Sequence, residues 1–500
     1  MNRNVNRWST MKKSKIIFLL IGALTATGQA NAANWLMLQG IEPQDAGHRF
    51  FGVAQATYIN NIGCNSLSGL AGTNGTVTGN PNAGQGLNNG RYNNNCTNGP
   101  RYKGPESIAI DTLMLGARGS MVPGNINYFL AVNLGENNTT YLPFKTSRER
   151  IAALTDASVT FSYIPGARIR AGLFKKPGPE ELMQSVEAGD YIFPTDFVAR
   201  VQQERFIDGN AQAGNPVPGQ GYTGNISAYG YDFDAGRDWG VQIFDGFKRD
   251  KWSYSYAAMI ANGNGIRHSD NNSDKDANLY VSAEHDLPGG KGPFKHGVKL
   301  YGYHQRGVRH FIVDAAGTKS QGFDRIRYGI GARALGELFG EDAGKHRLGL
   351  ELMYADGMVH YIPTGNIANG AFGGNAIQIA AERGNKARGL TLDYGYYLNP
   401  SWQFDVRYSR HDLLYQTAGV WKSSDKRVFD YLTLGANYYF APKIHLTVDY
   451  EFRDVRAPNA VVPTAGTAAA LNNAVVQTRN ANIMVDSIGD RFGARLTYSF

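Results

Sequence analysis

Arginines at alternate positions are the residues of this sequence best suited to chemistry. Arg168 and Arg170 lie in an RIR run, and Arg325 and Arg327 lie in a second RIR run later in the chain. In a strand, alternate side chains point to the same side, so each pair would present two permanent positive charges to one space. The guanidinium fork matches the oxygens of small anions, and these pairs therefore predict a path for anions.

The same reasoning extends to other basic residues on polar strand faces or in the longest connection. The predicted anion path consists of Arg168, Arg170, Lys176, Arg200, Arg205, Arg325, Arg327, Arg333 and Arg495. Acidic residues such as Asp111, Asp405 and Glu451 alternate on the polar faces as well. Two interpretations stay open: selection of anions, or opposed charged rows that set a field without a specific site.

Motifs for catalysis or metal binding are weak in comparison. The chain has no G-x-S-x-G and no H-E-x-x-H, and residues 340–345 lack the phosphate-loop spacing. His304 and His310 are typical of solvated side chains. Residues 270–276 alternate oxygens like a calcium loop, but Lys275 occupies the position that requires glycine. We therefore expect no enzyme activity, no metal and no cofactor.

The two cysteines, Cys64 and Cys96, both lie in a Gly/Asn-rich stretch after the N-terminal region. In an oxidising compartment this placement favours a disulfide that closes a long loop. Two free thiols, or a covalently held partner, are the alternatives that counting leaves open. No C-x-x-C-H motif occurs, so the chain itself would attach no c-type haem.

The N-terminus predicts export. Five basic residues precede an apolar run at 16–26, and 30–32 form an A-x-A cleavage site, which together are the parts of a secretory signal. We expect a signal peptide at 1–32, with Met11 as an alternative start, and a mature chain of 33–500. Its removal leaves 45 basic against 42 acidic residues. That small excess argues against nucleic-acid binding.

Apolar and polar residues then alternate over about ten positions at a time, which is the period of a strand. At the C-terminus, Phe492, Leu496 and Phe500 share one face and Arg491 and Arg495 the other. Sixteen such runs predict strands at 48–60, 107–119, 125–135, 155–164, 166–175, 236–247, 251–262, 276–286, 295–305, 325–336, 345–356, 387–398, 401–411, 428–440, 443–455 and 487–500.

The connections between these strands alternate between long and short. Long loops on one rim and tight turns on the other are typical of a transmembrane β-barrel with an even number of strands. Closure is required because an open sheet edge finds no water in the hydrocarbon region. Aromatic residues fall at strand ends, where interfacial girdles lie: Tyr163, Trp239, Trp252, Tyr394, Tyr396, Trp402, Tyr438, Phe440 and Phe500. We predict an all-β, antiparallel barrel of about sixteen strands, with residues 33–45 and Phe500 on the short-turn side.

Three segments carry a resemblance to a known family. GLFKKPGPEEL (172–182), RDWGVQIFDGF (237–247) and NGNGIRHSDNNSDKD (262–276) resemble the phosphate-selective porin O/P family. The resemblance implies a sixteen-stranded, usually trimeric outer-membrane channel for anions such as phosphate. It also implies that the segment after the first motif, here 176–235, folds inward as a constriction loop.

Together these features predict a channel of the Gram-negative outer membrane for passive diffusion of small hydrophilic solutes, with a preference for phosphate or other oxyanions. Its expected partners are the lipid bilayer, small anionic solutes and further copies of the chain in a homotrimer. One alternative keeps the barrel as a partner or sheath of a periplasmic multihaem cytochrome, or as part of an uptake system for an oxyanion such as selenite. An outer-membrane hydrolase is the other alternative, but no Ser/His/Asp or paired-carboxylate constellation can be assembled from the sequence.

Overall fold

The fold is taken from a computed structural model of the chain. The structure describes residues 35–38, 46–62, 106–137, 152–202, 222–224, 236–263, 265–266, 273–290, 294–312, 320–340, 344–361, 377–419, 423–458 and 489–500. The predicted signal peptide at 1–32, Cys64 with Cys96, and Arg205 lie outside these residues, so the cleavage and the disulfide stay predictions.

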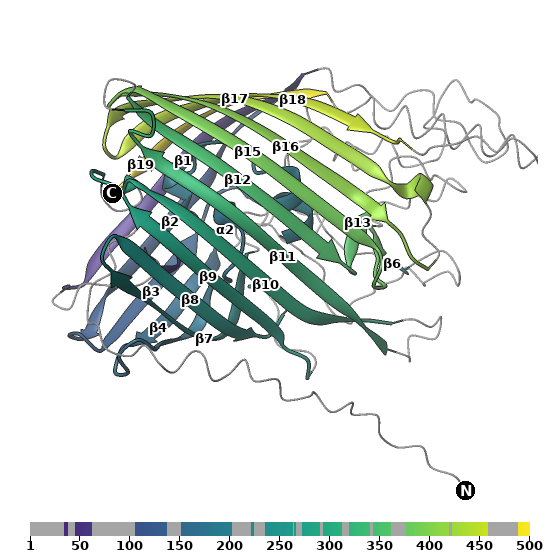
Figure 1. The fold of residues 1–500 in the computed structure, drawn as a ribbon, viewed down its shortest axis with the longest axis horizontal. Helices are drawn as coiled ribbons and strands as arrows, with labels where there is room; N and C mark the ends of the chain where they lie inside the picture. The colour runs from purple at the N-terminus through teal and green to yellow at the C-terminus, as the bar shows by residue number, and fades with distance from the viewer. Residues whose placement is uncertain are drawn as a thin grey trace, which may run out of the picture.

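Sixteen antiparallel strands form a closed barrel (Figure 1), as the alternation predicts. Each strand pairs with its neighbour in the barrel, and β1 pairs with β19 to complete the ring. The strands are β1 (Arg49–Ile62), β2 (Glu106–Val122), β3 (Ile126–Asn133), β4 (Ala153–Phe161), β5 (Arg168–Lys175), β7 (Arg237–Arg249), β8 (Trp252–Ala261), β9 (Asp276–Asp286), β10 (Gly297–Ile312), β11 (Ser320–Gly336), β12 (Lys345–Asp356), β15 (Lys386–Asn399), β16 (Trp402–Gln416), β17 (Arg427–Ala441), β18 (Ile444–Arg456) and β19 (Asp490–Ser499).

The last strand closes the barrel one residue before the end of the chain. β19 ends at Ser499, and Phe500 still exchanges two backbone hydrogen bonds with Gly52. The Phe500 ring lies against Gly52, where a Cβ would come within 2.2 Å of it. Glycine at position 52 therefore lets the C-terminal aromatic ring cover the seam of the barrel.

Apolar side chains cover the outer surface of the strands. Ile330, Leu434 and Val406 are exposed in the middle of their strands, while their sequence neighbours Gly331, Thr433 and Arg407 face inward. The predicted aromatic residues Trp252, Trp402 and the C-terminal Phe500 are exposed near the short-turn rim. An apolar outside and a polar inside are what a strand needs to face lipid on one side and water on the other.

Three short strands that are not part of the barrel wall were not predicted from the sequence. β6 (Tyr222–Gly224), β13 (Val359–Tyr361) and β14 (Ile377–Ala380) form a three-stranded sheet in the order β13-β14-β6. Each has three or four residues, which is too short for an alternation to be recognised.

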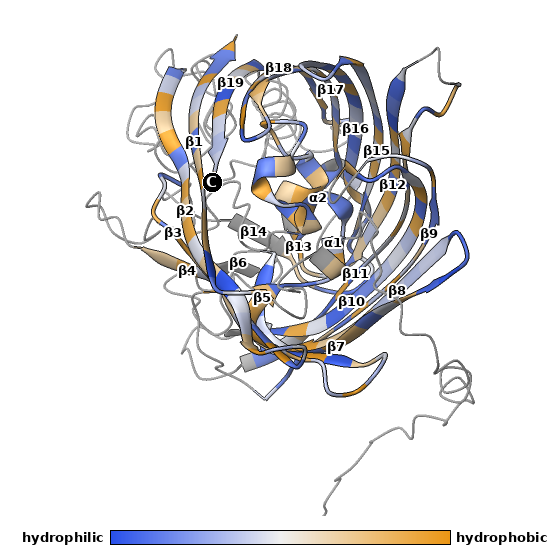
Figure 2. Ribbon diagram, turned by 90° about the vertical axis from the view of Figure 1, so that its left-hand side faces the viewer, coloured by the Kyte–Doolittle hydropathy of each residue, from blue (hydrophilic) through white to orange (hydrophobic). Residues whose placement is uncertain are grey.

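Within the described residues, helical structure is confined to short segments. In the parts of the chain that the structure describes, no helix has the length and hydrophobicity needed to cross a membrane. Figure 2 shows α1 (Trp35–Leu38) and α2 (Glu180–Met183) within the ring of strands. We call residues 176–202 the lumenal segment; it contains α2, the 3-10 turn η3 (Val186–Ala188) and the π-helical turn η4 (Val198–Gln202).

Candidate pore

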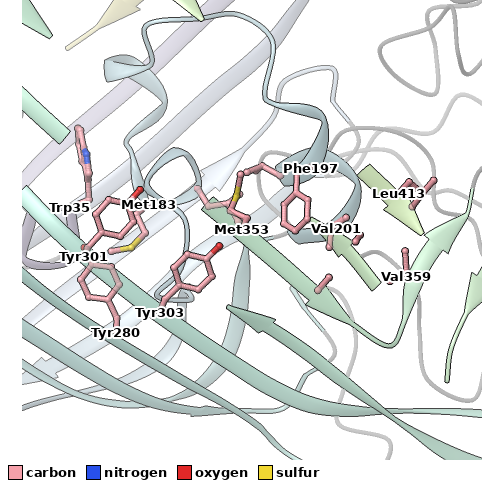
Figure 3. Close-up of a cluster of buried hydrophobic side chains, with 14 of the residues drawn as sticks. Trp35, Met183, Phe197, Val201, Tyr280, Tyr301, Tyr303, Met353, Val359 and Leu413 are labelled. Carbon is pink, nitrogen blue, oxygen red and sulfur yellow. The ribbon is translucent and has the colours of Figure 1, made fainter. Parts of the chain in front are cut away.

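Part of the barrel interior is filled with apolar side chains, which we call the apolar cluster (Figure 3). α1, α2 and η4 contribute to it, together with the inner faces of β7 to β18. Its larger members are Trp35, Leu36, Met37, Leu182, Met183, Phe197, Val198, Val201, Phe244, Tyr280, Tyr301, Tyr303, Met353, Val359, Leu413, Leu414, Phe429, Tyr431 and Val455.

The wall is shaped to receive this cluster. The Tyr301 ring lies over Gly331 of the adjacent strand, where a Cβ would come within 2.2 Å of it. Phe197 lies over Gly389 in the same way, where a Cβ would come within 2.7 Å of its ring. Because glycine has no side chain at these inward positions, the aromatic rings pack directly on the strand backbone.

The interior also holds a cavity that charged and hydrogen-bonding side chains line together with apolar ones such as Leu182, Val198 and Tyr301, and we call it the polar cavity. Its wall side comes from β1, β2, β3, β5 and β19 and from the inner faces of β10 to β16, and its other side comes from the lumenal segment. Polar and charged side chains that line it are Gln55, Asp111, Thr112, Asn133, Asn137, Lys175, Glu180, Glu181, Gln184, Ser185, Asp190, Tyr191, Thr195, Arg333, Glu351, Thr391, Asp393, Arg407 and Arg495.

One arginine of the wall holds the middle of the lumenal segment. Arg347 of β12 forms ion pairs with Asp190, with Asp393 at 2.9 Å and with Asp405 at 2.9 Å, and its side chain is only 1% exposed. Asp190 belongs to the lumenal segment, while the two other carboxylates belong to β15 and β16. A single buried guanidinium therefore ties the segment to three strands, and its loss would leave three carboxylates without that partner.

A second anchor holds α2. Glu180 accepts hydrogen bonds from the Lys299 Nζ at 2.5 and 2.6 Å and pairs with Arg333 at 3.4 Å. The Glu180 backbone N–H donates to Glu351 at 3.3 Å. These contacts fix the start of α2 against β10, β11 and β12.

Phe193 and its neighbour dock on the opposite part of the wall. The Ile192 N–H donates to Asp449 at 2.5 Å, and the Arg491 guanidinium lies 4.1 Å from the centre of the Phe193 ring. Gly493 leaves room for both side chains, with 2.9 Å from a Cβ position to Phe193. Cation–π contact and a charge-assisted hydrogen bond thus hold this stretch against β18 and β19.

The end of the lumenal segment is held by a charged trio. Asp196 pairs with Arg200 at 2.6 Å and with His411 Nδ1 at 2.7 Å. Burial by itself would raise the pKa of the Asp196 carboxyl, but Arg200 and His411 outweigh it and hold that pKa below its ordinary value. Arg327 of β11 adds hydrogen bonds to the backbone carbonyls of Val201, at 3.2 Å, and Met358, at 2.7 Å.

The segment also crosses to the seam of the barrel. Gln55 of β1 donates from its amide to the Val186 carbonyl at 3.1 Å and to Thr497 at 3.3 Å. The lumenal segment therefore contacts strands on both sides of the polar cavity, and its residues line that cavity.

The predicted anion-path residues separate into two groups. Arg333 and Arg495 line the polar cavity, and each is paired with a carboxylate. Arg495 contacts Asp111 at 2.6 Å and Thr57 at 2.9 Å. Both arginines therefore meet the cavity as one half of an ion pair.

The other predicted residues that the structure describes do not line the cavity. Arg170 is buried with its guanidinium 4.4 Å from the Phe244 ring, and Arg168 contacts Asp245 at 3.5 Å. Arg325 is buried and donates to Gln305 at 3.2 Å. Arg327 and Arg200 support the lumenal segment, as described above, and Lys176 is buried at its start. Burial lowers the pKa of Lys176, and the nearby Arg325 adds to that effect.

Sequence reasoning assigned no site to two arginines that the structure brings to the centre. Arg347 and Arg407 lie on the polar faces of their strands, so alternation places them inside, but their partners are far away in sequence. Arg407 donates to the Phe193 carbonyl at 2.6 Å and lies 4.2 Å from the centre of the Tyr191 ring. Only the fold of the lumenal segment brings these groups together.

Comparison with known proteins gives distant structural likenesses. No protein-family model matches the chain, and no curated protein matches it. Among solved structures, the chain is similar to an anion-selective porin from Comamonas acidovorans, at 13% identity and a TM-score of 0.45, covering 91% of this chain and 100% of that one. It is also similar to OprB of Pseudomonas putida, at 12% identity and a TM-score of 0.47, covering 91% and 94%. The outer membrane channel DcaP of Acinetobacter baumannii is 12% identical with a TM-score of 0.44, covering 91% and 97%.

Proposed function

We propose that this protein is an outer-membrane channel through which small hydrophilic solutes diffuse passively. The observation that carries the proposal is the polar cavity, which lies inside a closed barrel with an apolar outer surface. In a closed barrel, the backbone N–H and C=O groups of every strand are hydrogen-bonded within the lipid. Charged groups in its interior stabilise water and ions there. The described lumenal segment serves, in this proposal, as the constriction predicted for 176–235.

Selectivity is the finer part of the proposal. The cavity lining holds six carboxylates, Asp111, Glu180, Glu181, Asp190, Glu351 and Asp393, and four basic side chains, Lys175, Arg333, Arg407 and Arg495. The buried arginines outside the lining favour anions, while the excess of carboxylates in the lining opposes that effect. We therefore propose a weak preference for anions such as phosphate, set by the charges outside the lining.

The oligomeric state belongs to the same proposal. Apolar side chains are exposed on the outer faces of β1, β2 and β3, among them Phe50, Ile108, Ile110, Met121 and Leu130. An exposed apolar surface of this kind fits a neighbouring copy of the chain as well as lipid. We place the contacts of a homotrimer on these strands.

The sheath alternative needs an open lumen. A periplasmic cytochrome inside the barrel would occupy the space that the lumenal segment and α1 fill. We therefore keep the channel as the proposed function of this fold.

Planar-bilayer recording of the purified protein tests the proposal. We expect stepwise, ohmic conductance increments in potassium chloride, and a small reversal potential of the sign of an anion channel in a salt gradient. Insertion without conductance would contradict the channel. A reversal potential of the sign of a cation channel would remove the anion preference and leave a general diffusion channel.

A further inference from the structure

Outward-facing charges follow one another across the barrel at the ends of β10 to β18 that lead into the long connections. We call this row the arginine ladder. It consists of Arg306, Arg383, Arg388, Arg410 and Arg456, with the carboxylates of Asp324, Asp356, Asp412, Asp430 and Asp454.

Ion pairs join the ladder from strand to strand. Arg388 contacts Asp412 at 2.6 Å, and Arg410 contacts the same carboxylate at 3.0 Å. Arg410 also lies 3.7 Å from Asp430, which in turn pairs with Arg456. The register places these residues side by side, with Arg388 opposite Asp412 and Arg410 opposite Asp430. The row is therefore continuous from β15 to β18.

On the other side, Arg383 connects two further carboxylates. It contacts Asp356 at 3.2 Å and Asp324 at 3.8 Å, and Asp324 also pairs with Arg306 at 3.6 Å. These pairs extend the ladder over β10, β11 and β12.

In every pair of the ladder except Arg456 with Asp454, the arginine is more exposed than the carboxylate. The Arg388 side chain is 51% exposed while Asp412 is 1% exposed, and Arg383 is 54% exposed while Asp356 is 15% exposed. Apart from Asp454, which is 64% exposed, the carboxylates are thus more covered than the guanidinium groups beside them. The surface that another molecule meets is mainly cationic, with each guanidinium held in position by its carboxylate.

The level of the ladder on the barrel matters as much as its charge. Asp324 shares its strand face with Ile326, Tyr328 and Ile330, all of which follow it toward the short-turn rim. Asp430 likewise shares its face with Leu432 and Leu434. The ladder therefore begins where the apolar outer surface ends, which is the level of the lipid headgroups around a membrane-spanning barrel.

A different composition is found at the same ends of β1 and β2. There the exposed outward residues include Ile62, Ile108 and Ile110. The ladder thus marks a different sector of the barrel from the surface to which we assign the subunit contacts.

We propose that the arginine ladder binds the phosphate groups of anionic lipid headgroups in the outer leaflet. Guanidinium groups bind phosphate oxygens through two parallel hydrogen bonds and carry a permanent charge, and a row of them spaced by adjacent strands suits a headgroup with more than one phosphate. The ladder is on the outside of the wall, so its ligand is the surrounding lipid and not the solute in the pore. The inference rests on the proposed function only in that the barrel spans a membrane.

Binding of diphosphoryl lipid A to the full-length protein in neutral detergent tests the proposal. The variant Arg388→Gln/Arg410→Gln/Arg456→Gln should bind about tenfold more weakly, since each exposed charge contributes modestly. The control Lys248→Gln/Arg249→Gln/Lys251→Gln removes the same number of exposed cations at the short-turn rim and should bind as the unaltered protein does. Equal affinity in both triple variants would overturn the proposal.

Two further experiments control for misfolding of the variant and identify the source of the phosphate. Arg388→Gln/Asp412→Asn removes both partners of one pair, so the buried Asp412 carboxylate is not left without Arg388. This variant should still bind lipid A more weakly than the unaltered protein. Dephosphorylated lipid A should not bind detectably, and inorganic phosphate should not displace the bound lipid. Displacement by inorganic phosphate at the concentration of the lipid would overturn the lipid assignment. The triple ladder variant should keep the conductance of the unaltered protein in a bilayer. If the unaltered protein does not conduct, the proposed channel is contradicted, but the lipid-binding measurement still tests the ladder.

Discussion

The apolar cluster and the polar cavity share one barrel but differ in what the wall presents to them. Inward positions of β7 to β18 carry members of the apolar cluster such as Tyr280, although Arg407 on one of these strands lines the cavity. On β1, β2 and β19 they carry Gln55, Thr112 and Arg495, which face the cavity. Apolar area is stabilised by removal from water, whereas charged groups need water or a partner. In the proposed channel, solutes would therefore pass along the charged side chains of the cavity and not through the apolar cluster.

The largest difference between the two regions should follow from Arg347, which connects the lumenal segment to the wall. Arg347→Gln leaves Asp190, Asp393 and Asp405 without their shared cation, at a cost of about 4 kcal/mol in the free energy of unfolding. We expect a lower thermal unfolding midpoint and a higher single-channel conductance as the segment moves from the wall. Arg456→Gln, an exposed arginine on the outer face, is the control and should change neither. An unchanged conductance in Arg347→Gln would show that the segment does not bound the pore.

Removing apolar volume should affect stability without affecting the pore. Phe197→Ala leaves a cavity against Gly389 in the apolar cluster and should reduce the free energy of unfolding by about 3 kcal/mol. Because Phe197 does not line the polar cavity, the reversal potential in a salt gradient should stay the same. A changed reversal potential would mean that ions also pass through the cluster.

Charge changes in the polar cavity should do the opposite. Asp111→Asn leaves Arg495 as the unbalanced charge of that pair and should shift the reversal potential toward anions, whereas Arg495→Gln should shift it toward cations. A unit charge beside a water-filled path changes the permeability ratio by about two- to threefold. The two variants together form a matched pair, and shifts of the same sign would contradict the assignment of this wall to the pore.

Acid should loosen the end of the lumenal segment. Asp196 has a pKa below its ordinary value in the folded chain, so its ion pairs stabilise the fold above the unfolded value of about 3.9 and lose that effect as the pH falls through the folded pKa. The thermal midpoint of the unaltered protein should therefore exceed that of Asp196→Asn at neutral pH, and the gap should narrow as the medium becomes strongly acidic. A gap that is independent of pH would rule out the charged form of Asp196 as its source.

The smallest effect should come from an exposed pair outside both regions. Lys248 contacts Asp286 near the short-turn rim, and its side chain is 38% exposed. Lys248→Gln should change the free energy of unfolding by less than about 1 kcal/mol and leave conductance unaltered. A larger loss of stability in denaturant titration would indicate a role for this rim that the packing does not explain.

The barrel could be predicted from the sequence because strand alternation is local. Each of the sixteen predicted runs corresponds to one strand, and the differences are at the ends, as in β10, which continues to Ile312 beyond the predicted 305. Alternation stops being informative where a strand runs on into a connection with no lipid-facing side. The division of the interior depends on contacts such as Arg327 with the Val201 carbonyl, 126 residues away, which no spacing rule reveals.

For the same reason, the sequence predicts inward-facing charges for the anion path but not their depth. The sequence places Arg325 and Arg495 on inward faces, but it does not say which of them meets water. Arg325 lies buried beside Gln305, while Arg495 lines the cavity beside Asp111. The two arginines differ in how deeply the lumenal segment covers them, and this depends on tertiary packing, which strand alternation does not reveal.

Cysteine accessibility tests most directly whether solutes pass through the polar cavity and not through the apolar cluster. In a chain with Cys64 and Cys96 replaced by serine, Thr112→Cys places a thiol in the polar cavity and Ala257→Cys places one in the apolar cluster. A cationic methanethiosulfonate reagent added to single channels should lower the conductance of Thr112→Cys in a discrete step and leave that of Ala257→Cys unchanged. Block of Ala257→Cys with no effect on Thr112→Cys would contradict the account.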